Sequence, residues 1–235
     1  SMPALFGYSK ERMLKNTSIT CSEWTRADIR TIYGIDAKIA YPPVLPVPVS
    51  NTTTKRKDGF VFVGRISPEK RIEDIIAIGD IVRARGYPFE LHIIGPAYRK
   101  EYADYIFGLA KERADWVHIE GLADRKRLGE FLSTYTYGIN CTKDEQFGIS
   151  LVEMIYAGCL PFVYNGGGQL EVIDKNKDLY FSSLEEAAEK ILHVQKDEAL
   201  KTKLLKQLHS HAQKFSTSAY MHNIQHLVRH HLTEL

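Results

Sequence analysis

The stretch Phe60–Lys70, FVFVGRISPEK, is typical of a buried strand that passes directly into a helix. Its first four residues are all apolar, and apolar residues recur after it at helical spacing, at Ile72, Ile75, Ile76 and Val82. Ser67 fits the cap position of a helix and Pro68 fits its first turn, so we expect a helix N-terminus here. Arg65 and Lys70 would flank this positive helix end, an arrangement that can bind a diphosphate.

The same pattern continues along the chain. Apolar runs alternate with segments of helical spacing, and the runs lie at Phe60–Val63, Glu90–Ile94, Val117–Ile119, Tyr137–Cys141, Leu160–Tyr164 and Leu179–Phe181. This alternation predicts an α/β fold, a Rossmann-like doubly wound parallel sheet with helices on both faces. In such a sheet the ligand crevice lies beyond the carboxyl ends of the strands, and Gly64, Gly95, Gly121 and Thr142 each follow a strand.

A second motif, DEQFGISLVE at Asp144–Glu153, places two carboxylates eight positions apart around a Phe-Gly turn. The segment before it is apolar and Ile149 begins a helical pattern, so the motif spans a strand-to-helix junction. Free N–H groups at a helix start can hold phosphate oxygens, and Gly148 lets the backbone approach a ligand closely. Glu153 lies within reach of a hydroxyl of the same ligand. These features predict a nucleotide-sugar pocket.

Together the two motifs resemble the donor-binding domain of the retaining family 4 glycosyltransferases, which have the GT-B fold. They occur in the family's order and at its usual separation. The resemblance extends from about Ile19 to Val172 and includes Gly166-Gly167-Gly168, where the family has a glycine loop. The chain is therefore similar to the C-terminal half of a GT-B enzyme.

The resemblance implies roles for particular residues. Arg65 and Lys70 are expected to neutralise the donor diphosphate, and Glu145 is expected to contact and position the sugar; these three form the predicted catalytic set. Glu153 corresponds to the residue that holds the ribose hydroxyls, and Leu122 to a main-chain contact with the base. The predicted donor-binding residues are Gly64, Gly95, Leu122, Phe147, Gly148, Ile149, Ser150, Leu151 and Glu153.

The implied activity is a retaining glycosyl transfer that needs neither a cofactor nor a metal. The donor expected first is a UDP-sugar such as UDP-glucose, and the acceptor is a saccharide or a glycolipid. GDP-mannose is the alternative donor, since the Glu-x-Phe-Gly-Ile pattern also occurs in mannosyltransferases of this family. A nucleotide-sugar-binding module that is inactive without its partner domain is the other alternative.

The chain is expected to divide into four parts. Residues 1–41 are predicted to be a remnant of the N-terminal acceptor domain with the crossover, and the proline-rich residues 42–58 a linker. Residues 59–217 are the predicted donor-binding domain, and residues 218–235 a helix that packs toward the missing N-terminal domain. Most of that acceptor domain is expected to be absent from this chain, because family members are much longer.

Composition excludes several other classes. The 235 residues are 44% hydrophobic with a net charge of +2, so the sequence supports one sizeable core and no nucleic-acid partner. The three cysteines form no CxxC pair, which indicates reduced, largely buried thiols in a cytoplasmic protein. No apolar run reaches the length of a membrane span, and the resemblance implies that the full-length enzyme works peripherally at the cytoplasmic face of a membrane.

Histidines recur every four positions near the C-terminus, at His222, His226 and His230. This spacing places them on one face of a helix, where they could bind a metal. No acidic or cysteine partner lies at a fixed spacing from them. We therefore predict a solvated or interdomain helix face there, and no metal site.

Overall fold

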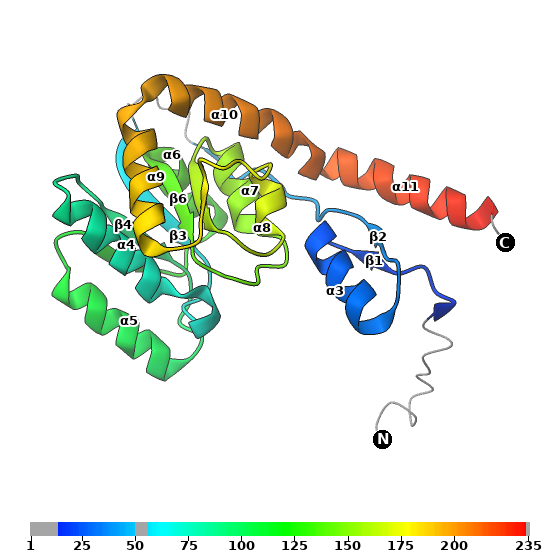
Figure 1. Cartoon of the computed structure of the whole chain (residues 1–235), viewed down its shortest axis with the longest axis horizontal. Helices are drawn as coiled ribbons and strands as arrows, with labels where there is room; N and C mark the ends of the chain where they lie inside the picture. The colour runs from blue at the N-terminus through cyan, green and yellow to red at the C-terminus, as the bar shows by residue number, and fades with distance from the viewer. Residues whose placement is uncertain (1–13, 50–55, 234–235) are drawn as a thin grey trace.

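Six parallel strands form the central sheet of the computed structural model, which describes residues 14–49 and 56–233 (Figure 1). The strands are β3 (Lys57–Val63), β4 (Leu91–Ile94), β5 (Val117–Gly121), β6 (Tyr135–Asn140), β7 (Leu160–Tyr164) and β8 (Tyr180–Phe181). Their order across the sheet is β5-β4-β3-β6-β7-β8. The chain thus runs outward from the central β3 in both directions, as in a Rossmann-like sheet, and the predicted fold class is confirmed.

Helices cover both faces of this sheet. They are α4 (Ile72–Ala84), α5 (Lys100–Glu112), α6 (Arg125–Thr134), α7 (Ile149–Tyr156), α8 (Gln169–Val172), α9 (Leu184–Lys196), α10 (Glu198–Ala212) and α11 (Thr217–Thr233), with 3-10 turns η1 (Pro68–Lys70) and η2 (Gln213–Phe215). Right-handed crossovers place α4 and α5 on one face and α6 and α7 on the other, and α9 packs back beside α4 (Figure 1).

The core is centred on β3, because this strand lies between β4 and β6 and is covered on both faces. Phe60, Val61 and Phe62 are almost completely buried. The Phe60 ring stacks on Phe89 with centroids 4.1 Å apart and on Tyr137 at 5.0 Å. Such continuous apolar strands are typical of parallel sheets, and this burial fixes the carboxyl end of β3, where the first motif begins.

A small unit of strand–helix–strand order precedes the sheet. It consists of β1 (Ile19–Thr20), α3 (Glu23–Tyr33) and β2 (Lys38–Ile39). The Glu171 carboxylate accepts hydrogen bonds from the Glu23 and Trp24 N–H groups, at 3.0 and 3.1 Å, and from the Tyr41 hydroxyl at 2.9 Å. Burial raises the pKa of the Tyr41 hydroxyl, and the neighbouring Glu171 adds to the rise. One buried carboxylate therefore holds this unit against the sheet domain.

The proline-rich stretch differs in part from the predicted linker over residues 42–58. The linker prediction is wrong at its end, where β3 already begins at Lys57, and residues 50–55 lie outside the described residues. Val44 and Val47 are buried, and the Val44 N–H donates to the Phe215 carbonyl at 2.9 Å. Residues 42–49 therefore pack on the domain, because Val44 and Val47 enter its core, while Val49 stays exposed.

The C-terminal helix α11 extends beyond the sheet and runs toward the small N-terminal unit (Figure 1). The Asn223 side chain donates to the Ile39 carbonyl in β2 at 2.9 Å. The contact of this helix with a further domain remains a prediction, and residues 234–235 lie outside the described part of the chain.

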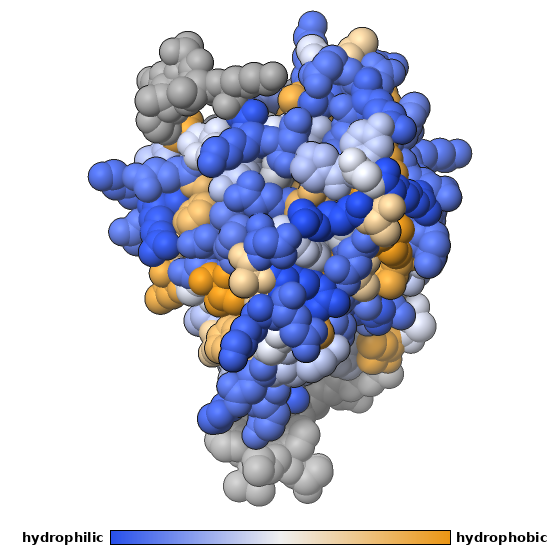
Figure 2. All heavy atoms as spheres, turned by 90° about the vertical axis from the view of Figure 1, so that its left-hand side faces the viewer, coloured by the Kyte–Doolittle hydropathy of each residue, from blue (hydrophilic) through white to orange (hydrophobic). Residues whose placement is uncertain are grey.

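The surface on the side opposite α11 is mainly hydrophilic, with apolar side chains in small, separate patches (Figure 2). Among the residues that the structure describes, no helix combines the length and the apolar character needed to cross a membrane.

Candidate active site

Two adjoining cavities, each of about 580 Å³, open between the two sequence motifs. They share Arg65, Lys70, Glu145 and Gln146 in their walls. The loop after β3 supplies the first two of these residues, and the loop between β6 and α7 supplies the other two. The site therefore lies at the carboxyl ends of β3 and β6, the two central strands. At this point of an open α/β sheet the order in which the chain adds strands reverses its direction.

Lys70 and Glu145 form an ion pair inside this site. The Lys70 Nζ atom donates to Glu145 Oε2 at 2.6 Å, although the two residues are 75 positions apart in the chain. Both side chains are 19% exposed, so the pair is shielded but still open to a ligand. The structure thus brings together two members of the predicted catalytic set.

Arg65, the third member, lies at the rim and is half exposed. Its guanidinium stacks over the Tyr98 ring, 4.6 Å from the ring centroid, and lies 3.6 Å from a carboxylate oxygen of Glu69. Stacking restricts a long, flexible side chain while leaving its N–H groups free for an anion.

The helix start predicted at Ser67 and Pro68 is that of the 3-10 turn η1 and not of α4. Ser67 lies at the cap position of η1 and Pro68 begins it, Arg71 then adopts a left-handed conformation with φ of 51°, and α4 begins at Ile72. The Ser67 hydroxyl donates to Glu69 at 2.7 Å and makes no side-chain cap. Lys70 therefore lies at the end of a tight turn that directs it toward Glu145, and the positive charge at this wall comes from side chains instead of the α4 terminus.

The start of α7 supplies the opposite wall. Gly148 has a φ of 104°, a conformation that L-residues with side chains rarely adopt, and Ile149 and Ser150 line the cavity in the first helical turn. The first N–H groups of a helix have no acceptors within it and carry partial positive charge. The side chain of Leu151 is buried in the core, and its N–H donates to the Gly148 carbonyl at 3.0 Å.

Phe147 anchors the loop that precedes α7. Its side chain is 3% exposed and packs edge-on against Phe215, with ring centroids 5.1 Å apart, and against Tyr41 at 5.9 Å. The ring therefore points into the core, so only the backbone of this residue is available to a ligand. The apolar anchor fixes the position of the neighbouring Gly148.

Glu153 lies in the wall of the second cavity with a side chain that is only 11% exposed. Its Oε1 atom accepts from Arg125 at 3.0 Å, and the same guanidinium donates to the Leu45 and Pro46 carbonyls at 2.9 and 3.2 Å. Sequence reasoning missed Arg125. It lies among other charged residues at the start of α6, and no local spacing connects it to Glu153.

The remaining predicted donor-binding residues take different positions. Gly64 lines the second cavity. Gly95 lines neither cavity, but a Cβ atom on it would lie 1.9 Å from the Gly64 carbonyl oxygen, so its role is to permit close packing of two loops. Leu122 is 76% exposed, and it lines neither cavity, so its side chain does not reach the site.

The glycine loop at Gly166-Gly167-Gly168 packs against the backbone of the loop that carries Glu145. Cβ atoms on Gly167 and Gly168 would lie 2.3 and 2.2 Å from the carbonyl oxygens of Glu145 and Gln146. The Gly168 N–H donates to the Glu145 carbonyl at 2.7 Å. These glycines permit direct backbone packing beneath the residue that pairs with Lys70.

All three cysteines are free thiols, and two of them are buried as predicted. Burial raises the pKa of the Cys159 thiol to about 11 and also raises that of Cys141. Cys21 is partly exposed and lines the second cavity.

Curated proteins with similar sequences include mannosyltransferases. The chain is 29% identical over 171 residues to a GDP-Man:Man(3)GlcNAc(2)-PP-Dol alpha-1,2-mannosyltransferase from Candida glabrata, which covers 66% of this chain and 34% of that protein. It is 27% identical over 192 residues to a protein of the same name from Dictyostelium discoideum, covering 72% and 38%. This chain therefore spans about a third of the length of these curated relatives.

Solved structures share the fold at low sequence identity. Sucrose-phosphate synthase from Thermosynechococcus elongatus has a TM-score of 0.79 and 21% identity, over 96% of this chain and 61% of its own. HepE from Anabaena, in complex with UDP and glucose, has a TM-score of 0.77 and 14% identity, over 91% and 62%. The fold is thus that of the C-terminal half of a GT-B enzyme.

The family model described as "Glycosyl transferases group 1" matches residues 48–215. The match includes both motifs and every strand of the six-stranded sheet. The chain therefore belongs to the group 1 glycosyl transferase family.

Proposed function

We propose that this chain is the donor-binding half of a retaining, metal-independent mannosyltransferase that uses GDP-mannose. The names of the mannosyltransferase relatives support GDP-mannose over the UDP-glucose expected first from the sequence. The Glu-x-Phe-Gly-Ile pattern is compatible with both donors, so it could not choose between them. The UDP bound to HepE carries little weight for the base, because 14% identity supports only the shared fold.

The observation that carries the proposal is the Lys70–Glu145 ion pair, which lies in one cavity with Arg65 and the first turn of α7. When a glycosidic bond to a diphosphate breaks, negative charge grows on the leaving phosphate. Fixed cations and helix N–H groups stabilise that charge in a partly shielded site. In this proposal Arg65 and Lys70 supply the positive charge that a metal ion supplies in other transferases.

Glu145 is proposed to position the sugar. Its Oε2 atom holds Lys70, so Oε1 remains for a sugar hydroxyl while the carboxylate stays neutralised. A carboxylate held in this way is a weak nucleophile, which agrees with a role in orientation. When the donor enters, Lys70 can contact both Glu145 and the diphosphate.

Glu153 is proposed to accept the ribose hydroxyls. Arg125 donates to Oε1 and so holds the carboxylate in one rotamer. Oε2 is then the atom that would accept from the ribose. Because Arg125 also binds the carbonyls of Leu45 and Pro46, it joins residues 42–49 to the wall of the site.

The transfer reaction is proposed for the whole enzyme, since this chain spans about a third of its curated relatives. The names of those relatives support a lipid-linked saccharide as acceptor, and we place the reaction at the cytoplasmic face of a membrane. A binding module without transfer activity is the alternative. A fusion of this chain to an acceptor half from a relative separates the two, since only the enzyme would transfer mannose.

Calorimetric titration of the chain with GDP, UDP, GDP-mannose and UDP-glucose tests donor binding. We expect the guanine compounds to bind at least about 10-fold more tightly than the uridine compounds. The affinities should not change when a chelator is added. Preference for UDP would refute the base assignment, loss of affinity in chelator would refute metal independence, and no binding to any of the four would refute the site.

A further inference from the structure

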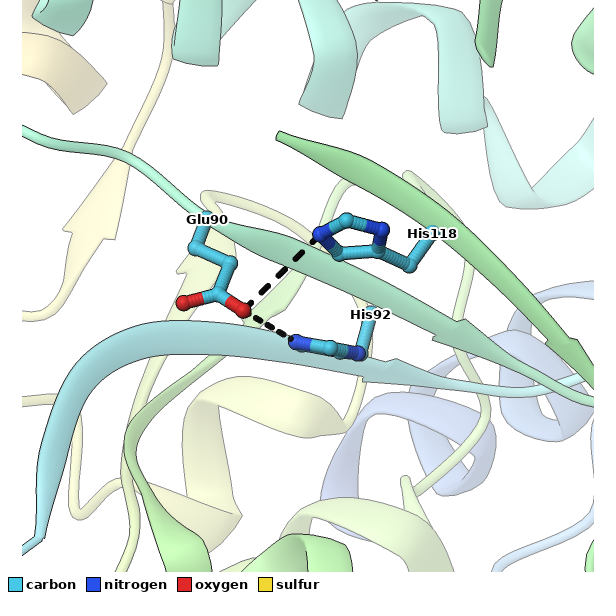
Figure 3. A group of neighbouring side chains, drawn as sticks. All are labelled: Glu90, His92 and His118. Atoms are coloured by element: carbon cyan, nitrogen blue, oxygen red, sulfur yellow. Dashed lines mark hydrogen bonds and ion pairs between the residues drawn. The ribbon is translucent and has the colours of Figure 1, made fainter. Parts of the chain in front are cut away.

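Glu90, His92 and His118 form a second cluster of reactive side chains, away from the donor cavities (Figure 3). Glu90 directly precedes β4, and His92 in β4 lies opposite His118 in the edge strand β5. The two imidazole rings have centroids 4.8 Å apart. The Phe131 ring of α6 packs over His92 at 5.6 Å, so the cluster lies between the sheet and α6, toward the amino ends of the strands.

Carboxylate oxygens face both ring nitrogens of His92. Its Nδ1 atom lies 2.8 Å from Glu120 Oε1, and its Nε2 atom lies 3.0 Å from Glu90 Oε1. A neutral imidazole has only one N–H group, so one nitrogen would direct a lone pair at a carboxylate oxygen. The side chain of His92 is 7% exposed, so solvent screens this repulsion poorly. Either a proton or a metal ion must lie between the ring and a carboxylate.

The positions of the donor atoms fit a metal ion. One ligand atom from each of Glu90, His92 and His118 lies within 4.8 Å of the other two. In a tetrahedral zinc site with bonds near 2.1 Å, ligand atoms lie about 3.4 Å apart. The His92 Nε2–Glu90 Oε1 and His118 Nε2–Glu90 Oε1 distances of 3.0 and 3.8 Å lie on either side of that value.

A second group of side chains orients the cluster. Glu120 accepts a hydrogen bond from Nδ1 of His92 in the tautomer that suits a metal ion. In this tautomer Nε2 carries the lone pair, which points toward Glu90. The other carboxylate oxygen of Glu120 accepts from Arg127 of α6 at 3.1 Å. A histidine held by a carboxylate on its second nitrogen is the usual arrangement at protein metal sites.

We propose that Glu90, His92 and His118 bind a divalent transition-metal ion, for which Zn²⁺ has the best-matched ligand chemistry. Three protein ligands leave a fourth position for water. The bound ion would join the edge strand β5 to β4 and, through Glu120 and Arg127, to α6. None of the three ligands lines a donor cavity, so this site is distinct from that of the proposed mannosyl transfer.

Zinc titration of the metal-free chain tests the proposal. Because His222, His226 and His230 lie on one helix and could add weak binding, a variant with all three changed to alanine serves as the parent. We expect this parent to bind one Zn²⁺ per chain by calorimetry, to melt at a higher temperature with zinc, and to give a tetrahedral absorption spectrum with Co²⁺.

The variants separate this site from general histidine binding. His118→Ala should abolish the one-site binding, and Glu120→Gln should weaken it by about 10-fold or more. His193→Ala, which removes an exposed histidine of α9, should leave it unchanged. His118 is 35% exposed, so its removal should leave the fold intact, as a melting curve without zinc will show. No zinc uptake by the parent, with His92 carrying a proton on both nitrogens by NMR, would overturn the proposal, as would undiminished uptake by His118→Ala.

Discussion

Replacement of Lys70 by alanine tests the central contact of the proposed site. A hydrogen bond from a charged group contributes about 1.5–3 kcal/mol, so loss of the ammonium should raise the dissociation constant of GDP by about 10- to 150-fold. The same change leaves Glu145 without the partner that now lies 2.6 Å from its Oε2 atom. The unpaired carboxylate then faces the diphosphate and weakens binding further.

The size of this repulsion can be estimated. Two unit charges about 5 Å apart interact by about 3 kcal/mol at an effective dielectric constant of 20, and salt reduces this value. The double variant Lys70→Ala/Glu145→Ala should therefore bind GDP more tightly than Lys70→Ala alone. Glu145→Ala by itself leaves Lys70 free for the diphosphate, so GDP affinity should be retained, but affinity for GDP-mannose should fall because the sugar contact disappears.

Calorimetry with GDP and GDP-mannose at low and high salt measures these differences, with a melting curve for each variant to establish folding. Lys126→Ala, which removes an exposed charge of α6 outside both cavities, should stay within twofold of the parent. Lys70→Ala within twofold of the parent would refute the assigned contact. A double variant no better than Lys70→Ala would refute the coupling to Glu145.

Three further predictions follow from the structure. Gly148→Ala should lower the free energy of unfolding by about 1–3 kcal/mol in a denaturant titration, because of its φ of 104°, whereas Gly108→Ala, with open space at its Cβ, should not. Cys21 should be the thiol that iodoacetamide modifies fastest, and bound GDP should slow this reaction; equal rates with and without GDP would contradict its place in the cavity wall. The hydrogen bond from Lys190 lowers the pKa of Glu186 from 4.5 in the folded protein. The ionised Glu186 therefore stabilises the fold above pH 4.5, and this stabilisation is lost as the pH falls through the lower folded-state pKa. Glu186→Gln should reduce the fall in the free energy of unfolding on acidification.

Much of the fold could be predicted from local patterns. The apolar run at Phe60–Val63 and the helical spacing from Ile72 are properties of neighbouring residues, and the strand and the helix both formed there. The exact residues at which helices begin were less predictable. Ser67 and Pro68 have the residue types of a helix start, but the Ser67 hydroxyl bonds to Glu69, and the chain turns at Arg71 before α4 begins.

The site was predictable only in part. The sequence identified Lys70 and Glu145 as candidates, since charged residues beside strand ends can be recognised from their neighbours. It carried no information on the side chains of Leu151, which enters the core, and Leu122, which lies outside both cavities; the main-chain contacts expected of these two residues stay predictions. The orientation of a side chain at a helix start depends on what packs against the helix, and local spacing does not contain that information.

The sequence by itself determined the α/β class and the two charged motifs, because apolar periodicity and turn chemistry act over a few neighbouring residues. Only the tertiary structure decided which distant groups meet. Arg125 at the start of α6 reaches Glu153 in α7 although 28 positions separate them, and His92 faces His118 because β4 and β5 pair in one particular register. Such contacts depend on how whole strands and helices are arranged, and a shift of one residue in the register would direct these side chains to opposite faces of the sheet.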